Sequence, residues 1–267
     1  MHDLFKSYFS KPPTFEKDGD YYYESDVDGD CFDETDAEYW LSGLFEKRLN
    51  QPVLSNEALG YFKADILAHF AKHQAPFVDV ACGPAMGLAP LILSEFPDVL
   101  CLATDACSLL IKLWRKYLKS CNSLYNINLA ACSLMDLPFK SNSVDVVTSY
   151  IGLGSTRDGE SGKIKATSEV FRILKPGGVL ITVENEWLER DAIAEVFRLW
   201  GRPIWSSFAE ESTSWRDKFE QCGFIIESGD NTLEVPVRAD DNELGEQAHK
   251  FGIPIVNKHT LYIARKP

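Results

Sequence analysis

The sequence predicts an α/β fold in which helices cover both faces of a mainly parallel, doubly wound sheet. The first observation is that, from Pro76 onward, short apolar runs alternate with amphipathic stretches, as in strand–helix–strand units. The second is that one run, Val144-Asp-Val-Val-Thr148, carries a single charge, which is typical of a strand covered on both faces. The chain has 267 residues, enough for one such domain with additional covering elements.

The first 54 residues have a different composition. Residues 16–38 are rich in Asp, Glu and Tyr and contain three consecutive tyrosines, Tyr21–Tyr23. They do not fit a calcium-binding loop, because neither register places Gly at the sixth position and Glu at the twelfth. So many aromatic side chains are uncommon in a disordered tail. We therefore expect residues 1–54 to form a separate segment, with a helix near Asp36–Asn50.

The main domain, residues 55–267, is expected to begin with a helix that runs from a Ser55 cap to Phe70. Five strands then alternate with helices along the chain. The strands are expected at Phe77–Cys82, Val99–Thr104, Ile127–Ala131, Val144–Tyr150 and Val179–Glu184. The helices are expected at Leu88–Phe96, Ser108–Lys119 and Lys163–Leu174, the last ended by the glycine-containing turn Leu174-Lys-Pro-Gly-Gly178.

Two further helices and two further strands are expected after Glu184. One helix places Ile193, Val196, Phe197 and Trp200 on one face. Another begins at Ser214, where Asp217 completes a capping box. The strands are expected at Gly223–Glu227 and Thr260–Ala264, with a polar insertion at residues 237–258 between them.

The charge of the chain limits its partners. The chain has 40 acidic and 27 basic residues and a formal net charge of −13. Such a surface repels phosphate backbones and anionic lipids, so we expect neither nucleic acid nor a membrane as partner. The densest basic stretch, Lys112–Lys119, is spaced like the solvent-facing side of an amphipathic helix. No apolar stretch has the length of a membrane span, and we expect a soluble, cytoplasmic protein.

Metal and disulfide sites are not expected. The chain has seven cysteines, an odd number, and contains no CxxC pair. His69 and His73 lie four residues apart on a helix, but no third ligand accompanies them.

A turn of small residues follows the first strand of the main domain and leads directly into a helix. It reads Asp79-Val-Ala-Cys-Gly83-Pro-Ala-Met-Gly87. Small residues let a ligand approach the backbone, and the helix N-terminus behind them offers N–H groups and a partial positive charge. The next strand leads to Asp105, 20 residues after Ala85, where a carboxylate can accept hydrogen bonds from ribose hydroxyls. Together the turn and the acid indicate a ligand that contains adenosine.

These motifs resemble those of the class I S-adenosylmethionine-dependent methyltransferases, in particular the small-molecule branch typified by quinone-biosynthesis C-methyltransferases. The turn differs from the G-x-G-x-x-G pattern of nicotinamide enzymes. The resemblance is strong over residues 76–184, weaker up to residue 267, and not visible before residue 55. Besides the turn and Asp105, it rests on Asp136-Leu-Pro-Phe139, Ser143-Val-Asp-Val-Val147, Arg172-Ile-Leu-Lys-Pro-Gly-Gly-Val-Leu180, Phe224-Ile-Ile226 and Tyr262-Ile-Ala-Arg-Lys266.

The resemblance implies a seven-stranded, Rossmann-like methyltransferase sheet of order 3-2-1-4-5-7-6, in which the last strand alone is antiparallel. It also implies S-adenosylmethionine as cofactor. A methyl-transfer site must exclude water and still release its product, so we expect an N-terminal helical lid, with residues 14–50 across the C-terminal edge of the sheet.

The resemblance assigns the cofactor contacts residue by residue. Asp79 would steer the methionine amino group, Asp105 would hold both ribose hydroxyls, and Ala106 would lie near the adenine. Ser133 and Leu134 stand where the family often has an acid and a small residue. The full set of expected cofactor-binding residues is Asp79, Ala81, Cys82, Gly83, Asp105, Ala106, Ser133, Leu134 and Tyr150.

Two alanines, Ala81 and Ala85, replace glycines that the family usually has in this turn. Each alanine adds a methyl group near the expected cofactor. We expect cofactor binding to survive both changes, because the conformational freedom of glycine is needed only where φ is positive.

The expected function is transfer of a methyl group from S-adenosylmethionine to a small, uncharged or cationic molecule. Because the donor is already activated, alignment and water exclusion are the main tasks of the enzyme, and the identity of any catalytic residue stays open. Residues expected to face the methyl group are Tyr150, Ile151, Gly152, Glu184, Asn185 and Glu186. Further candidates for a general base are His249 and His259.

A cap over the acceptor is expected around residues 185–215 and 237–258. Its aromatic residues are Trp187, Trp200, Trp205, Phe208 and Trp215. Two other functions fit the same fold: aminopropyl transfer, for which Glu184 and Glu186 would supply paired acids, and a non-catalytic protein that binds S-adenosylmethionine or a partner. The sequence does not specify the acceptor, the accepting atom or the oligomeric state.

Overall fold

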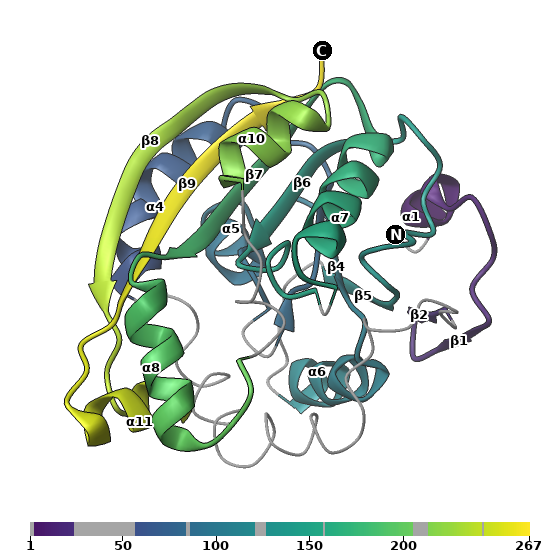
Figure 1. The fold of residues 1–267 in the computed structure, drawn as a ribbon. Helices are drawn as coiled ribbons and strands as arrows, with labels where there is room; N and C mark the ends of the chain where they lie inside the picture. Colours follow the sequence, from purple (N-terminus) through teal and green to yellow (C-terminus); the bar gives the residue numbers. More distant parts are fainter. Residues whose placement is uncertain are drawn as a thin grey trace.

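The computed structural model describes residues 3–23, 57–83, 86–120, 127–156, 158–204, 213–241 and 243–267. Within them the centre of the molecule is one sheet of nine strands in the order β1-β2-β5-β4-β3-β6-β7-β9-β8 (Figure 1). The strands are β1 (Phe15–Lys17), β2 (Asp20–Tyr22), β3 (Phe77–Asp79), β4 (Cys101–Asp105), β5 (Ile127–Ala131), β6 (Val144–Tyr150), β7 (Leu174–Trp187), β8 (Ile225–Pro236) and β9 (Val256–Arg265).

The strands from β3 onward form the parallel centre and one side of the sheet. β5, β4, β3, β6 and β7 pair in parallel, and β9 is antiparallel to both β7 and β8. Numbered from β3, this part reads 3-2-1-4-5-7-6. The expectation of seven strands is wrong, because β1 and β2 extend the sheet beyond β5. β2 is parallel to β5, and β1 is antiparallel to β2. β1 therefore runs in the same direction as β9, which is not the only antiparallel strand.

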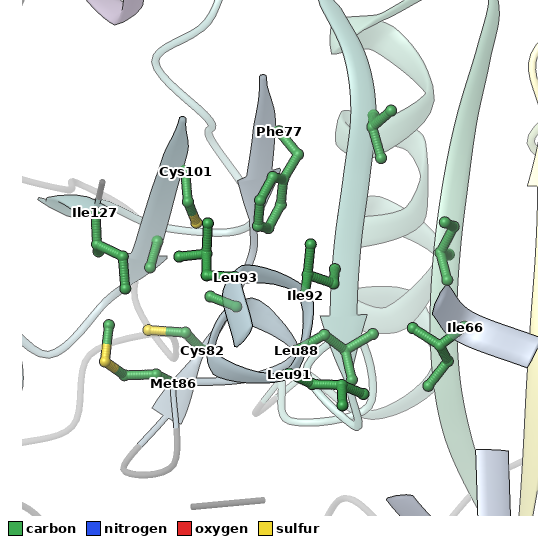
Figure 2. Close-up of a cluster of buried hydrophobic side chains, with 14 of the residues drawn as sticks. Ile66, Phe77, Cys82, Met86, Leu88, Leu91, Ile92, Leu93, Cys101 and Ile127 are labelled. Carbon is green, nitrogen blue, oxygen red and sulfur yellow. The ribbon is translucent and has the colours of Figure 1, made fainter. Parts of the chain in front are cut away.

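Helices cover both faces of this sheet, as expected for a doubly wound α/β fold (Figure 1). α4, α5 and α6 bury their apolar residues in one cluster, and α7 and α10 bury theirs in another. Figure 2 shows side chains of α5 between Phe77 and Cys101 of the sheet and Ile66 of α4. The helices are α1 (Asp3–Tyr8), α4 (Glu57–Phe70), α5 (Ala89–Glu95), α6 (Ser108–Ser120), α7 (Gly159–Ile173), α8 (Arg190–Trp200), α10 (Trp215–Gln221) and α11 (Glu243–Phe251).

Ion pairs join the N-terminal hairpin of β1 and β2 to α6. Asp20 is fully buried, and its carboxylate accepts hydrogen bonds from Arg115 Nε at 2.8 Å and Nη2 at 2.5 Å. Asp18 accepts from Lys119 Nζ at 2.6 Å. The expectation that the basic stretch of α6 only faces solvent is therefore wrong, since two of its cations hold the hairpin.

The lid expectation has two parts with different outcomes. β1 and β2 are strands at the edge of the sheet, so this part of the expected helical lid is wrong. Residues 24–50, including the expected helix Asp36–Asn50, lie outside the described residues.

In the C-terminal third of the chain, the main difference from expectation is the length of the strands. β7, β8 and β9 are longer than expected, and the insertion at residues 237–258 contains α11. Leu244 of α11 packs with Ile193 and Phe197 of α8 in a small separate cluster beyond the end of β7 (Figure 1). The capping box at the start of α10 is confirmed.

Candidate functional site

The turn after β3 is built from backbone conformations that few residues adopt. Ala81 and Gly83 have φ values of 49° and 57°, and Met86 and Gly87 have 58° and 56°. These left-handed conformations end β3 at Asp79, three residues before the expected end. Pro84 and Ala85 lie outside the described residues.

Asp79 lies fully buried beneath this turn. Its Oδ2 accepts hydrogen bonds from Leu88 N at 2.9 Å and from Thr148 Oγ1 at 2.6 Å. A Cβ atom on Gly87 would lie 2.0 Å from Oδ1, so the glycine is required for this packing. Burial raises the pKa of Asp79 to about 7, and the hydrogen bond from Thr148 opposes the shift. Asp79 therefore joins β3, β6 and the start of α5.

Asp105, the last residue of β4, is 5% exposed and is held against the turn. Its Oδ2 accepts from Gly83 N and its Oδ1 from Cys107 N, both at 2.9 Å. A carboxylate oxygen has two lone pairs and can accept more than one hydrogen bond. Among the described residues, no atom lies within 4 Å of where a Cβ atom on Gly83 would be, so their arrangement leaves space beside it. A carboxylate at the border of such a space fits the two hydroxyls of a ribose.

Trp114 of α6 fixes the other side of Gly83. Its Nε1 donates to Gly83 O at 3.2 Å. The role of Trp114 is not visible in the sequence, because its partner is a backbone carbonyl and the helical pattern explains the side chain as a packing residue. Ala106, between Asp105 and Cys107, is half-buried.

Cys82 contributes to the turn rather than offering a side chain to a ligand. The side chain lies in the apolar cluster near Leu93 and Cys101 (Figure 2). Its N–H donates to Thr104 O at 2.8 Å, and its carbonyl accepts from Gly87 N at 2.8 Å.

The segment after β5 lies against the end of β4. Cys132 N donates to Asp105 O at 2.9 Å, which brings Ser133 and Leu134 next to the turn. Both residues are buried, and Ser133 Oγ accepts from Met135 N at 3.1 Å. The structure therefore gathers the expected residues of three loops at one place.

The end of β6 touches the same turn. β6 ends at the half-buried Tyr150, and the next residue, Ile151, has φ 57°, which is rare for a β-branched residue. A Cβ atom on Gly152 would lie 2.9 Å from Ala81 Cβ, so the missing side chain at Gly152 makes room for the alanine methyl. The positive φ at Ala81 contradicts our reason for dismissing the change from glycine there.

The candidate catalytic residues have different environments. Glu184 is fully buried, and burial raises its pKa to about 7. Glu186 Oε2 lies 3.0 Å from Lys258 Nζ, so a cation already pairs with one of the two acids that aminopropyl transfer would use. Burial lowers the pKa of His259 to about 4, and His249 is exposed in the last turn of α11.

The described residues contain neither a membrane-spanning helix nor a cluster of metal ligands. Among the residues that the structure describes, no helix combines the length and apolar character needed to cross a membrane. Over the same residues, no three His, Cys, Asp or Glu side chains are grouped so as to hold a metal ion.

Solved structures share this fold. The YcgJ protein of Bacillus subtilis is 18% identical, with a TM-score of 0.56 over 76% of this chain and 98% of that chain. Phosphoethanolamine N-methyltransferase 2 of Haemonchus contortus, solved with S-adenosyl-L-methionine, is 13% identical, with a TM-score of 0.51 over 84% of this chain and 60% of that chain.

Sequence relatives point to one family. A demethylmenaquinone methyltransferase of Listeria monocytogenes is 28% identical over 174 residues, 64% of this chain and 68% of that protein. The ubiquinone/menaquinone biosynthesis C-methyltransferase UbiE of Shewanella halifaxensis is 25% identical over 148 residues, 55% of this chain and 54% of that protein. The model of the ubiE/COQ5 methyltransferase family matches residues 51–222, more than half of the chain. This protein therefore belongs to the ubiE/COQ5 methyltransferase family and transfers a methyl group from S-adenosylmethionine to a small molecule.

Proposed function

We propose that the loops after β3, β4 and β5 hold S-adenosylmethionine and that the acceptor is an uncharged aromatic molecule of the quinol class. The observation that carries the cofactor part is the carboxylate of Asp105, fixed by Gly83 N and Cys107 N beside an open space. When bound, the cofactor supplies an electrophilic methyl group.

Each expected cofactor residue has a role in this proposal. Asp105 accepts hydrogen bonds from the ribose hydroxyls, while Ala106, Ser133 and Leu134 surround the adenine. Ala81 and Gly83 line the amino-acid and ribose portions. Asp79 and Cys82 hold the shape of the turn, and Tyr150 lies at the methyl end.

The acceptor class is supported by three observations. The relatives named above are methyltransferases of demethylmenaquinone and of the ubiquinone and menaquinone pathways. The net charge of −13 disfavours an anionic acceptor. Trp187 and Trp200 pack with α8 and α11 beyond the end of β7, where they can border an apolar acceptor.

The remaining parts of the proposal concern organisation. Residues 1–54 supply a segment that includes a lid, and residues 55–267 form the methyltransferase domain, with caps around 185–215 and 237–258. The protein acts in the cytoplasm on a small molecule and does not bind nucleic acid or insert into a membrane.

The cofactor site is tested by titration calorimetry with S-adenosylhomocysteine. Asp105→Ala should weaken binding at least tenfold, because it removes hydrogen bonds to a charged group worth about 1.5–3 kcal/mol each. Asp98→Ala, which changes an exposed acid, is the matched control and should bind like the wild type. Equal affinity of the Asp105 variant and the wild type would contradict the proposed cofactor position.

The acceptor class is tested separately. Purified protein is incubated with S-adenosylmethionine and a short-chain demethylmenaquinone in its reduced form, and the product is identified by mass spectrometry. We expect one added methyl group on the ring. Binding of the cofactor without methylation of this quinol would contradict the acceptor class and leave the cofactor site in place.

A further inference from the structure

One buried carboxyl oxygen near the proposed acceptor site has no hydrogen-bond partner. Glu184 lies near the end of β7 with its side chain fully buried. Its Oε1 accepts from Thr182 Oγ1 at 2.7 Å. Its Oε2 makes no hydrogen bond of good geometry in the part of the chain that the structure describes, although the backbone N–H groups of Leu153 and Gly154 face the carboxyl and lower its pKa. A buried polar atom without a hydrogen bond lowers the stability of a folded protein. A role in the function of the protein would explain why this one is kept.

A single glycine lies over this oxygen. A Cβ atom on Gly154 would lie 3.6 Å from Glu184 Oε2 and 3.4 Å from Trp215 Cζ2. Gly154 is itself partly exposed, so the carboxyl lies directly beneath a residue that has no side chain to cover it.

Gly154 belongs to the loop that follows β6, at the C-terminal edge of the sheet. This loop begins with Ile151 and Gly152, and Gly152 touches the cofactor turn at Ala81. In an open α/β sheet, ligands bind at this edge. The oxygen of Glu184 therefore lies beneath the loop that touches the proposed cofactor turn.

Charged side chains surround Glu184 on the face covered by α7 and α10. Lys163 of α7 is 5% exposed, with its Nζ 5.8 Å from the ring centre of Trp215. Burial lowers the pKa of Lys163 to about 8, and the neighbouring Lys218 contributes to this shift. Other titratable groups that face this region are Glu160 on α7, Arg216 and Lys218 on α10, Arg190 on α8, Glu186 on β7, and Lys258 and Tyr262 on β9.

We propose that Glu184 is the general base of the reaction and that its Oε2 accepts the proton that the methyl acceptor loses. This inference rests on the proposed function. The acceptor's bond to hydrogen breaks, its electrons form the new bond to the methyl carbon, the pair of the S–CH₃ bond remains on sulfur, and the proton goes to Oε2. The pKa of about 7 suits this task, since a base near the working pH is both available and effective.

The first test needs no acceptor. Difference infrared spectra of the wild type and Glu184→Gln, both saturated with S-adenosylhomocysteine, isolate the carboxyl signal of Glu184 during a pH titration. We expect the carboxyl to lose its proton near pH 7. A carboxyl that stays protonated, or stays ionised, throughout the neutral range would overturn the proposal.

The second test measures methyl transfer with the reduced short-chain demethylmenaquinone. Glu184→Gln keeps the shape of the side chain and should lower kcat at least about 100-fold, the usual range for loss of a general base. The wild-type rate should rise with pH through about 7, and the Gln variant should lose this dependence. Glu184→Asp, which restores a carboxyl, should recover part of the rate.

Two further variants separate catalysis from folding. Glu234→Gln changes an exposed glutamate on β8, the strand at the edge of the sheet beyond β9, and should leave the rate unchanged. Gly154→Ala places a methyl group over Oε2 at ordinary contact distance, so it should fold normally and keep the infrared titration, yet lower kcat.

The failures of the two proposals are distinguishable. A wild type that does not bind S-adenosylhomocysteine contradicts the cofactor site. A Glu184→Gln protein that binds it and retains the wild-type rate and pH profile overturns the assignment of the base alone. If the quinol is not methylated, the infrared titration still shows whether the Glu184 carboxyl changes its protonation state near pH 7.

Discussion

Two acids, Asp79 and Glu184, are fully buried and have a pKa of about 7 in the folded protein. Each pKa lies above that of the unfolded chain, so the folded state binds these protons more tightly. The stability they provide is complete below the unfolded pKa values and is lost as the pH rises to about 7. The protein should therefore be less stable in mildly alkaline than in mildly acidic solution as far as these groups are concerned.

Glu184→Gln tests this dependence at one residue. The wild type should lose about 2 to 3 kcal/mol more unfolding free energy than the variant between about pH 5 and about pH 8. Urea unfolding at both pH values measures the difference, and Glu234→Gln serves as the control. Parallel pH dependence in wild type and Glu184→Gln would show that the Glu184 carboxyl is not perturbed.

The positive φ of Ala81 gives a second prediction for a single residue. A left-handed conformation costs an L-residue about 1–2 kcal/mol, and glycine avoids this cost. Ala81→Gly should therefore raise the unfolding free energy by about 1 kcal/mol, even though glycine gains freedom in the unfolded chain. Ala166→Gly, within α7, should instead destabilise the protein. If Ala81→Gly lowers the unfolding free energy, the backbone at Ala81 is not strained.

At the scale of elements, two ion pairs join the hairpin to α6 and differ in burial. The pair of Asp20 and Arg115 is 0% and 18% exposed, whereas Asp18 and Lys119 are 44% and 57% exposed. Asp20→Asn should cost about 3 kcal/mol, because it leaves Arg115 without its buried anion. Asp18→Asn should cost no more than about 1 kcal/mol. Urea unfolding of the two variants compares them directly, and equal losses would argue against the role of burial.

Helices and strands could be predicted where the residues that determine them lie close together in the sequence. The capping box of Ser214 and Asp217, and the alternation that gives β3 to β7 and their helices, depend on near neighbours in the sequence. β1 and β2 were missed because each has three residues and their place depends on β5 and Arg115, about a hundred residues away.

In the candidate site, too, local features could be predicted from the sequence and long-range contacts could not. The spacing of Asp79 and Asp105 was sufficient to locate two acids at the ends of neighbouring strands. The φ of Ala81, the contact of Gly152 with it, and the Glu184 oxygen that has no hydrogen-bond partner among the described residues all involve groups that are far apart in the sequence. No short motif encodes these contacts.

At the scale of the whole molecule, the path of the N-terminal chain supports the lid proposal. Tyr22 pairs with Ala131, the last residue of β5, and Tyr23 N donates to Ala131 O at 2.9 Å. The chain thus leaves β2 at the same edge as the cofactor loops. We predict that residues 24–50 gain protection from hydrogen exchange when S-adenosylhomocysteine binds.

Mass spectrometry of exchange with and without this ligand measures the prediction. Peptides from β8 and β9 near Arg265 provide the control, because they lie at the opposite end of the sheet. Equally fast exchange of residues 24–50 in both states would remove the lid from the proposal.

The hairpin of β1 and β2 also has a consequence for aggregation. Without it, β5 would be the border of the sheet, and its sequence Ile127-Asn-Leu-Ala-Ala131 would present unpaired backbone groups beside apolar side chains. Such a border is a template for strands of other molecules. β1 replaces it with three exposed residues, two of them charged, Glu16 and Lys17. Residues that add nothing to the chemistry of methyl transfer can therefore keep one copy of the protein from joining another.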